Sequence, residues 1–294
     1  MLPSTLSDIP YGPHPRHKFD VWLPPGKGDG PFPFYLHIHG GGYGGGDKRP
    51  LNIDMLQTML GGGVAVASCN YRFVSDPEYF APLKDGQRAL QFIRHHAAEY
   101  KLDKTRVALG GGSAGAATSF WLGFAPDRAD PQSPDPVARE STRVTCIAAW
   151  EAQTTLDPLY FKKLLGGPTW TIGSISALTR LSIDQYDTPE GRERIKEIAC
   201  TEWIDKDTPP VFLFNMTPNL PLGDTLEIGP GIHHPRIASA LKEMLDPLGI
   251  ECVLRTREEF APDAPASEYY PSMFKSLGEF VVRHLNYGKI PRTR

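Results

Sequence analysis

The sequence predicts an α/β fold, with a mostly parallel central sheet and helices on both of its faces. Short apolar runs alternate along the chain with longer segments in which apolar residues recur at helical spacing. This order is typical of parallel sheets covered by helices. Several of the short runs, such as "GVAVASCNY" at 63–71, are apolar almost throughout. Strands that are buried on both faces have this composition.

The predicted strands are short, and most are bounded by Gly, Pro or charged residues. They lie at 19–24, 31–39, 63–71, 106–111, 143–150, 209–215 and 250–256. The predicted helices lie at 82–103, 113–124, 235–249 and 269–285. The helix at 235–249 begins with Pro235 and ends with Gly249, as helices often do.

We expect the whole chain, 1–294, to form a single domain. A Pro- and Asp-rich stretch at 126–142 is predicted to be a surface loop, because these residues favour turns. Residues 151–208 contain helical fragments without a clear strand. We therefore expect them to form a small cap-like insertion over the sheet rather than a second domain.

Composition and charge restrict the partners. With 40% hydrophobic and 22% charged residues, the chain has an ordinary globular composition. The net charge is −3 and no run of Lys and Arg stands out, which argues against nucleic acid and anionic membranes as partners. No apolar run reaches the roughly 20 residues of a membrane helix, and the first residues lack the apolar core of a signal peptide, so a cytoplasmic location is expected. The sequence gives no basis for an oligomeric state.

No cofactor or metal is expected. The four cysteines, three of them in apolar strand-like runs, form no Cys/His cluster with the spacing of a metal site. They are expected to be buried thiols that pack as small hydrophobic side chains.

The segment "GGSAG" at 111–115 fits the pattern G-x-S-x-G between a predicted strand and a predicted helix. In that context the pattern places a serine on a sharp strand-to-helix turn, with its hydroxyl exposed above the sheet. Ser113 is therefore the candidate nucleophile, and the amide of Ala114 can donate to an oxyanion at the helix N-terminus. The alternative is a glycine-rich turn that only permits close packing.

The segment "HIHGGGYGGG" at 37–46 places six glycines directly after a predicted buried strand. Glycine is costly in chain entropy but lets the main chain approach a ligand closely. Gly40, Gly41 and Gly42 can therefore turn amide groups toward a developing negative charge. The alternative is a flexible loop with no ligand.

Three motifs resemble the esterase/lipase branch of the α/β-hydrolase fold: "HGGGY" at 39–43, "NYR" at 70–72 and "GGSAGA" at 111–116. The lead-in at 9–24 also resembles carbohydrate-esterase-like members. The resemblance implies an α/β-hydrolase fold and serine-dependent hydrolysis of carboxylic esters without a metal. It implies Ser113 as the nucleophile, with Gly41, Gly42 and Ala114 as oxyanion-hole donors, and it implies that His39 stabilises its loop.

The sequence departs from that family at the base and the acid. The family has a histidine after the last strand, but the loop at 257–272 contains none. It also has an acid after the strand that follows the insertion, but no carboxylate lies near Asn219. Without a base nearby, a serine hydroxyl is a poor nucleophile at neutral pH.

Two consecutive histidines offer a replacement. His233 and His234 lie at the entrance of the helix that begins near Pro235, on the rim where the strands of a parallel sheet end. Either could be the base, because triads are defined by geometry rather than sequence order. Alternatively, His234 caps the helix and His233 is a loop residue. The sequence slightly favours His233, since His234 is better placed to be the cap.

Four carboxylates are candidates for the orienting acid. Asp224 and Glu227 precede the histidines, while Glu151 and Asp157 follow the previous strand. The sequence does not rank these four carboxylates, although Asp224 is retained as the candidate.

Two functions of different classes are consistent with these residues. The first is a serine carboxylesterase that acts on short-chain, for example acetyl, esters through an acyl-enzyme on Ser113, with an atypical triad. Its substrate would be a small-molecule ester, and an acylated sugar is one candidate by resemblance. The second is a catalytically impaired or non-catalytic hydrolase-fold protein that binds a ligand, because the expected histidine is missing.

Overall fold

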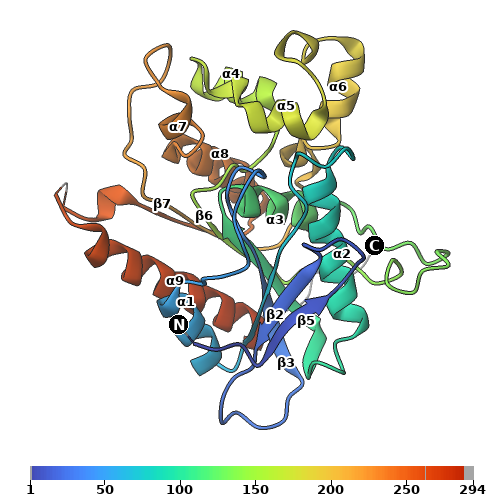
Figure 1. Ribbon diagram of the computed structural model, residues 1–294. Coiled ribbons are helices and arrows are strands. Elements are labelled where there is room, and N and C mark those ends of the chain that lie inside the picture. The colour runs from blue at the N-terminus through green and yellow to red at the C-terminus, as the bar shows by residue number, and fades with distance from the viewer. Residues whose placement is uncertain (1, 262, 288–294) are drawn as a thin grey trace.

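The sheet runs through the middle of the molecule and contains eight strands in the order β1-β2-β4-β3-β5-β6-β7-β8 (Figure 1). The computed structural model describes residues 2–261 and 263–287. β1 and β2 pair antiparallel, as do β2 and β4, and all other neighbours are parallel. The strands are Leu6–Pro10 (β1), Lys18–Trp22 (β2), Phe32–Ile38 (β3), Ala65–Cys69 (β4), Leu102–Gly112 (β5), Cys146–Trp150 (β6), Val211–Asn215 (β7) and Cys252–Thr256 (β8).

Helices connect the strands and cover both faces of the sheet. The α-helices are Ile53–Gly61 (α1), Ala81–His95 (α2), Ala114–Phe124 (α3), Pro158–Leu165 (α4), Gly173–Thr179 (α5), Pro189–Lys196 (α6), Ile228–Gly231 (α7), Pro235–Leu245 (α8) and Ala266–Tyr287 (α9). The short 3-10 helices are Thr169–Thr171 (η1), Ile183–Gln185 (η2), Cys200–Trp203 (η3), Asp246–Leu248 (η4) and Arg257–Glu259 (η5). Together with the sheet, this arrangement confirms the predicted α/β class.

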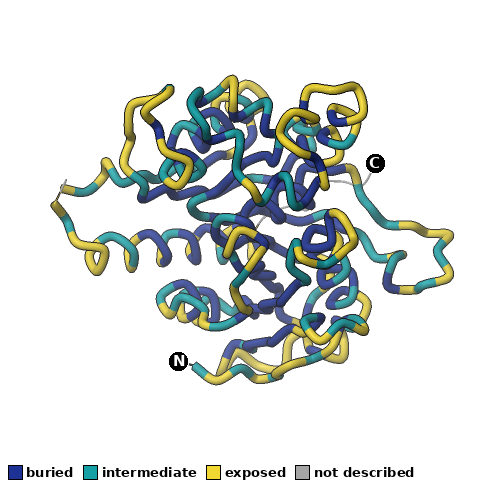
Figure 2. The backbone as a smooth tube through the Cα atoms, turned by 45° about the horizontal axis from the view of Figure 1, so that its top comes forward, coloured by how far each residue is buried: buried dark blue, intermediate teal, exposed yellow. Residues whose placement is uncertain are grey.

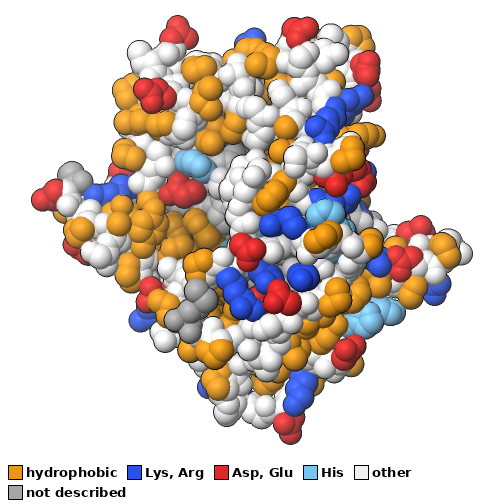
Figure 3. Space-filling view, viewed as in Figure 1, with side chains coloured by type: hydrophobic (Ala, Val, Ile, Leu, Met, Phe, Trp, Pro, Cys, Tyr) orange, Lys and Arg blue, Asp and Glu red, His pale blue; other side chains and the backbone are white. Residues whose placement is uncertain are grey.

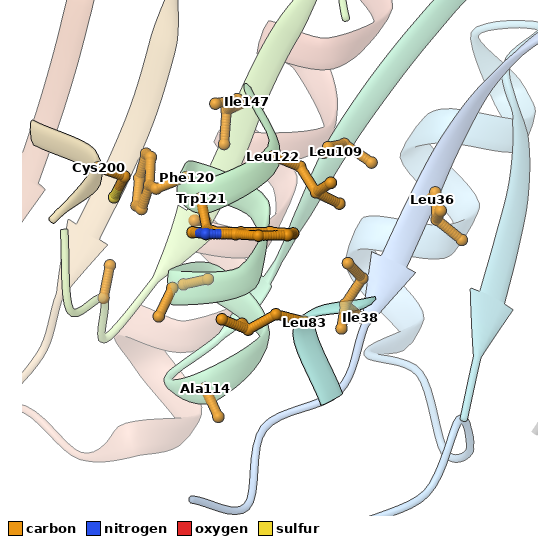
Figure 4. Close-up of a cluster of buried hydrophobic side chains, with 14 of the residues drawn as sticks. Leu36, Ile38, Leu83, Leu109, Ala114, Phe120, Trp121, Leu122, Ile147 and Cys200 are labelled. Carbon is orange, nitrogen blue, oxygen red and sulfur yellow. The ribbon is translucent and has the colours of Figure 1, made fainter. Parts of the chain in front are cut away.

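Alternating strand side chains build two cores. Tyr35 and Phe212 belong to the core that includes α1 and α9, whereas Leu36 and Leu109 belong to the one that includes α2, α3 and α8. Side chains alternate along a strand, so the sheet is buried on both faces (Figure 2). In Figure 4, Trp121 and its neighbours on α3 lie next to the strand side chains of the second core.

β1 and α1 were not predicted from the sequence, and neither was the short helix α7. β1 lies at the edge of the sheet and has no fully buried residue, so its sequence lacks an apolar run. α1 is a nine-residue helix that begins after Asn52. The Asn52 side chain accepts hydrogen bonds from the amides of Asp54 and Met55 at 3.0 and 3.1 Å.

The predicted helix at 82–103 was too long. α2 ends at His95, and β5 already begins at Leu102. Lys101 has φ 58°, in the left-handed region, which a helix cannot continue. Leu102, which the predicted helix included, is buried as a strand residue.

Residues 151–208 contain α4, α5, α6 and three of the 3-10 helices, and they form no strand. α4, α5 and α6 lie together at the top of Figure 1, beyond the ends of β6 and β7. The predicted surface loop at 126–142 is also without helix or strand.

Charged side chains of both signs are interspersed on the face shown in Figure 3. The four cysteines are free and buried. Among the helices of residues 2–261 and 263–287, none has the length and apolar character needed to cross a membrane.

Leu109 provides a test of the core. It is fully buried on β5, between Leu36 and Ile147 on the neighbouring strands. We expect Leu109→Ala to lower the free energy of unfolding by about 2–5 kcal/mol, because it leaves a cavity in a packed core. Leu248→Ala is the control, since Leu248 is 43% exposed and should change stability by less than about 0.5 kcal/mol. Equal effects in urea denaturation would contradict this description of the core.

Candidate active site

Ser113 lies on a strained turn between β5 and α3. Its φ of 52° and ψ of −119° fall in a region that residues other than glycine rarely occupy, and such strain concentrates at functional sites. Its amide donates a 3.0 Å hydrogen bond to the carbonyl of Trp150, the last residue of β6. The turn is therefore fixed to the neighbouring strand.

Two glycines of the motif make this turn possible. A Cβ atom on Gly111 or on Gly115 would overlap the carbonyl oxygen of Ile38, the last residue of β3. The main chain around Ser113 is thus pressed against the end of β3. This contact explains why small residues flank the serine on both sides.

The glycine-rich loop lies beside Ser113. A Cβ atom on Gly40 would lie 2.8 Å from the Gly112 carbonyl oxygen and 3.5 Å from the Ser113 Cβ. Gly41 and Gly42 have φ of 111° and 58°, which glycine adopts at no steric cost. This loop and the serine turn therefore approach each other as closely as main chains can.

His39 holds the loop through its ring. Its Nδ1 lies 2.7 Å from the Gly40 carbonyl, and its Nε2 lies 3.2 Å from Nη2 of Arg16. The ring stacks on Tyr71 at a centroid distance of 4.1 Å, and the Tyr71 hydroxyl donates to the His39 carbonyl. Burial lowers the pKa of His39 to about 4, so the ring is neutral at neutral pH. These contacts give His39 a structural role.

Ser113 lines a small cavity of about 30 Å³. Gly42 and Ala114, two of the three expected oxyanion-hole donors, line the same cavity, and Gly41 precedes Gly42 in the loop. Much of the remaining wall comes from the 151–208 insertion and is mostly apolar. The residues of this remaining wall, inside and outside the insertion, are Tyr43, Gln153, Leu156, Phe161, Ile172, Ser174, Ile175 and Ile232.

His233 lies between α7 and α8, with its ring fixed by the main chain. Its Nδ1 is 2.8 Å from the carbonyl oxygen of Glu151. The side-chain nitrogen of Gln153 lies 3.2 Å from the same ring nitrogen. In the tautomer whose Nδ1 carries the proton and donates to the Glu151 carbonyl, the lone pair of the neutral ring is on Nε2. No residue in the described ranges forms a hydrogen bond with that Nε2.

His233 is connected to the Ser113 turn and its cavity through neighbouring residues. Glu151, which binds the ring, directly follows the Trp150 that binds the Ser113 amide. The side chain of Gln153 lines the cavity and donates to the carbonyl of Ile232 at 2.6 Å. Ile232 also lines the cavity and precedes His233. Among the described residues, however, none forms a hydrogen bond with the Ser113 hydroxyl.

The structure corrects the candidate role of His234. This residue is the N-cap of α8, and its Nδ1 accepts a 3.0 Å hydrogen bond from the Arg236 amide. Its Nε2 lies 2.8 Å from the carbonyl of Leu220, and the residue is fully buried. Because both ring nitrogens are engaged, His234 has no lone pair available to take a proton from Ser113.

The structure also corrects Asp224 as the orienting acid. Asp224 is exposed in a turn between β7 and α7, whereas the Nδ1 of His233 binds the Glu151 main chain. Glu227 is exposed too, and Asp157 caps α4 by accepting a 2.8 Å hydrogen bond from the Leu159 amide. Of the four acidic residues considered, Glu151 is the one that contacts His233, and it does so through its main-chain carbonyl.

Sequence reasoning missed Gln153. It follows β6 by three residues and connects the cavity wall with the segment that carries His233. Its position after the carboxyl end of a central strand was the available signal, because ligand sites in parallel sheets lie at these ends. Within residues 2–261 and 263–287, no group of three or more His, Cys, Asp or Glu residues could hold a metal ion.

Comparison with known families agrees with this geometry. The BD-FAE family model matches residues 19–218, about two thirds of the chain. The chain belongs to the BD-FAE family. The BD-FAE match includes the glycine-rich loop and the Ser113 turn but ends before His233. Membership confirms the resemblance to α/β-hydrolase esterases that the motifs had indicated.

A curated relative and two solved structures are similar to this BD-FAE member. Esterase LipQ of Mycobacterium tuberculosis is 33% identical over 112 residues, which are 37% of this chain and 27% of LipQ. The chain thus matches about a quarter of that relative's length. A truncated carbohydrate esterase from gut microbiota has a TM-score of 0.69 at 17% identity, with 95% of both chains covered. An esterase from Thermogutta terrifontis has a TM-score of 0.65 at 17% identity, covering 94% of this chain and 90% of that one. These structures confirm the α/β-hydrolase fold.

His234 should contribute to stability and not to turnover. We expect His234→Ala to lower the free energy of unfolding by about 1–3 kcal/mol, because the helix loses its cap and the Leu220 carbonyl loses a buried partner. His234→Asn should recover part of this loss, because asparagine is a good N-cap. Urea denaturation measures both effects. A His234→Ala protein of wild-type stability would contradict the capping role.

Proposed function

We propose that this protein is a carboxylic ester hydrolase that cleaves short-chain esters through an acyl-enzyme on Ser113. One observation carries the proposal. The strained turn that carries Ser113 and the glycine-rich loop meet at one cavity, lined by Ser113, Gly42 and Ala114. A nucleophile and main-chain donors at a common cavity are what acyl transfer requires. The relatives described as esterases are consistent with it.

In the proposed mechanism, His233 is the base. Its Nε2 takes the proton of the Ser113 hydroxyl as the oxygen attacks the ester carbonyl, and it then protonates the leaving alcohol. Water, deprotonated by the same nitrogen, hydrolyses the acyl-enzyme. The hydrogen bond from Nδ1 to the Glu151 carbonyl supports this role, since it leaves the lone pair on Nε2. Nε2 of His233 and the Ser113 hydroxyl, both in the described part of the chain, form no hydrogen bond with each other, and catalytic contacts often tighten only in the complex with substrate.

The amides of Gly41, Gly42 and Ala114 are the proposed oxyanion hole. The attacked carbonyl oxygen becomes negative, and each preorganised donor typically lowers the barrier by about 2.7–4 kcal/mol. The position of Ala114 at the first turn of α3 adds the field of the helix N-terminus. The contacts of His39 and Tyr71 support the fixed shape of this loop.

The cavity size supports a short acyl group. A water molecule needs roughly 10–15 Å³ of such space, so the cavity of about 30 Å³ accommodates only one or two heavy atoms beyond the carbonyl. Leu156, Phe161 and Ile172 of the 151–208 insertion supply apolar wall, and we propose that this insertion acts as a cap over the site. A sugar is the alcohol component that the likeness to a carbohydrate esterase suggests, which makes an acylated sugar the candidate substrate.

Removal of the nucleophile or the base should abolish turnover of p-nitrophenyl acetate. We expect Ser113→Ala to lower kcat by about 10⁴-fold or more, and His233→Ala by at least about 100-fold, because it removes general-base catalysis.

A fluorophosphonate probe should label wild-type Ser113 rapidly. Acetate binding without labelling would instead favour the second candidate function, a non-catalytic ligand-binding protein. One observation favours this alternative: among the described residues, the Ser113 hydroxyl has no hydrogen-bond partner.

Acyl length should determine the rate. Each methylene that overfills a packed site costs about 1–3 kcal/mol, so kcat/KM for p-nitrophenyl butyrate should be at least about tenfold below that for the acetate. Ile172→Ala should narrow this difference, because Ile172 lines the cavity and is only half-buried. Steady-state kinetics with acetate, butyrate and octanoate esters measure how kcat/KM depends on acyl length. Equal or rising rates with chain length would contradict a short acyl site.

A further inference from the structure

Glu151 occupies an unusual position next to the proposed base. It directly follows β6 and has φ of 46°, in the left-handed region. For a residue other than glycine this conformation costs of order 1–3 kcal/mol and persists only where surrounding contacts hold it. Here the Glu151 amide donates a 3.0 Å hydrogen bond to the Phe214 carbonyl of β7. The strained backbone directs the Glu151 carbonyl to Nδ1 of His233 at 2.8 Å.

The carboxylate of Glu151 is fixed as firmly as its main chain. Oε1 accepts a 2.6 Å hydrogen bond from the amide of Met216, and Oε2 accepts a 3.1 Å hydrogen bond from the hydroxyl of Thr217. These two residues directly follow β7. The side chain thus places a negative charge at the end of the strand whose following loop has no carboxylate near Asn219.

We propose that Glu151 is the positioning residue of His233: its carbonyl fixes the Nδ1 proton, and its carboxylate stabilises the imidazolium that forms when Nε2 takes the proton of Ser113. This inference rests on the proposed esterase function. In a serine triad one carboxylate performs both tasks by accepting the Nδ1 proton directly. In this chain they are divided between the main chain and the side chain of one residue.

Electrostatics agree with the geometry. Burial raises the pKa of the Glu151 carboxyl above its ordinary value, while the Met216 hydrogen bond and the His233 charge oppose that rise. A positive charge on His233 thus favours the ionised form of the Glu151 carboxyl. Tyr270 on α9 is a further titratable group that interacts with Glu151, and it is neutral in the pH range in which histidine titrates.

Glu151→Gln separates charge from shape, because glutamine retains an oxygen that can accept the Met216 hydrogen bond. We expect kcat for p-nitrophenyl acetate to fall about 10-fold to 100-fold, since a nearby opposite charge typically shifts such an equilibrium by one unit or more. The acidic limb of the pH–rate profile should also move to lower pH by about one unit, because the imidazolium loses a stabilising charge. KM should change little.

Two variants serve as controls. Glu258→Gln removes a negative charge from an exposed residue just after β8 and should leave rate and profile unchanged. Glu151→Asp keeps the charge but shortens the side chain, so its acidic limb should stay near that of the wild type while kcat falls less than in Glu151→Gln. If Glu151→Gln fails to fold, Glu151→Asp alone tests the inference. A shift of its acidic limb in the pH–rate profile to lower pH by one unit or more would overturn the inference.

The outcomes distinguish this inference from the function on which it rests. If wild-type turnover persists in Ser113→Ala, the esterase proposal fails, and the inference fails with it. If turnover requires Ser113 and His233 but Glu151→Gln keeps the wild-type rate and pH profile, only the inference fails. A lower kcat with an unmoved acidic limb, equal in Glu151→Gln and Glu151→Asp, would indicate a purely structural role and would also overturn it.

Discussion

The site depends on one steric constraint, the contact between the Ser113 turn and the end of β3. Any side chain at Gly111 or Gly115 would overlap the Ile38 carbonyl oxygen, so the turn fits only with glycine on both sides. The hydrogen bond from the Ser113 amide to Trp150 fixes the turn to β6 on its other side. The strain at Ser113 is therefore maintained by the three central strands and not by the turn itself.

The remaining groups gather around this turn because parallel strands end at the same edge of the sheet. β3 leads into the glycine-rich loop, β6 into Glu151 and Gln153, and β7 into the segment that reaches His233. Each group is held by main-chain contacts: His39 by the Gly40 carbonyl and His233 by the Glu151 carbonyl. A site built on strand ends with main-chain anchors is preorganised before a ligand arrives.

The sequence predicted the sheet, most of the helices and the Ser113 turn, because these have strong local signals: buried apolar runs, helical spacing and obligatory glycines. β1 was missed because an exposed edge strand has no apolar run. The helix at 82–103 was predicted too long because residues 96–101 contain no Gly or Pro to mark its end. The choice between His233 and His234 had no local signal beyond the cap position. Only the tertiary hydrogen bonds of His234 to Leu220 and of His233 to Glu151 distinguish the two rings.

The attachment of His233 to a peptide carbonyl has an evolutionary consequence. The acceptor that orients the ring is the main-chain carbonyl of residue 151, whereas the negative charge of this residue comes from its side chain. In the proposed mechanism, a substitution at position 151 would therefore change the charge beside the base while the main-chain acceptor of its Nδ1 proton remained. Such a separation leaves room for gradual adaptation that a shared Asp–His contact, in which one group does both jobs, does not allow.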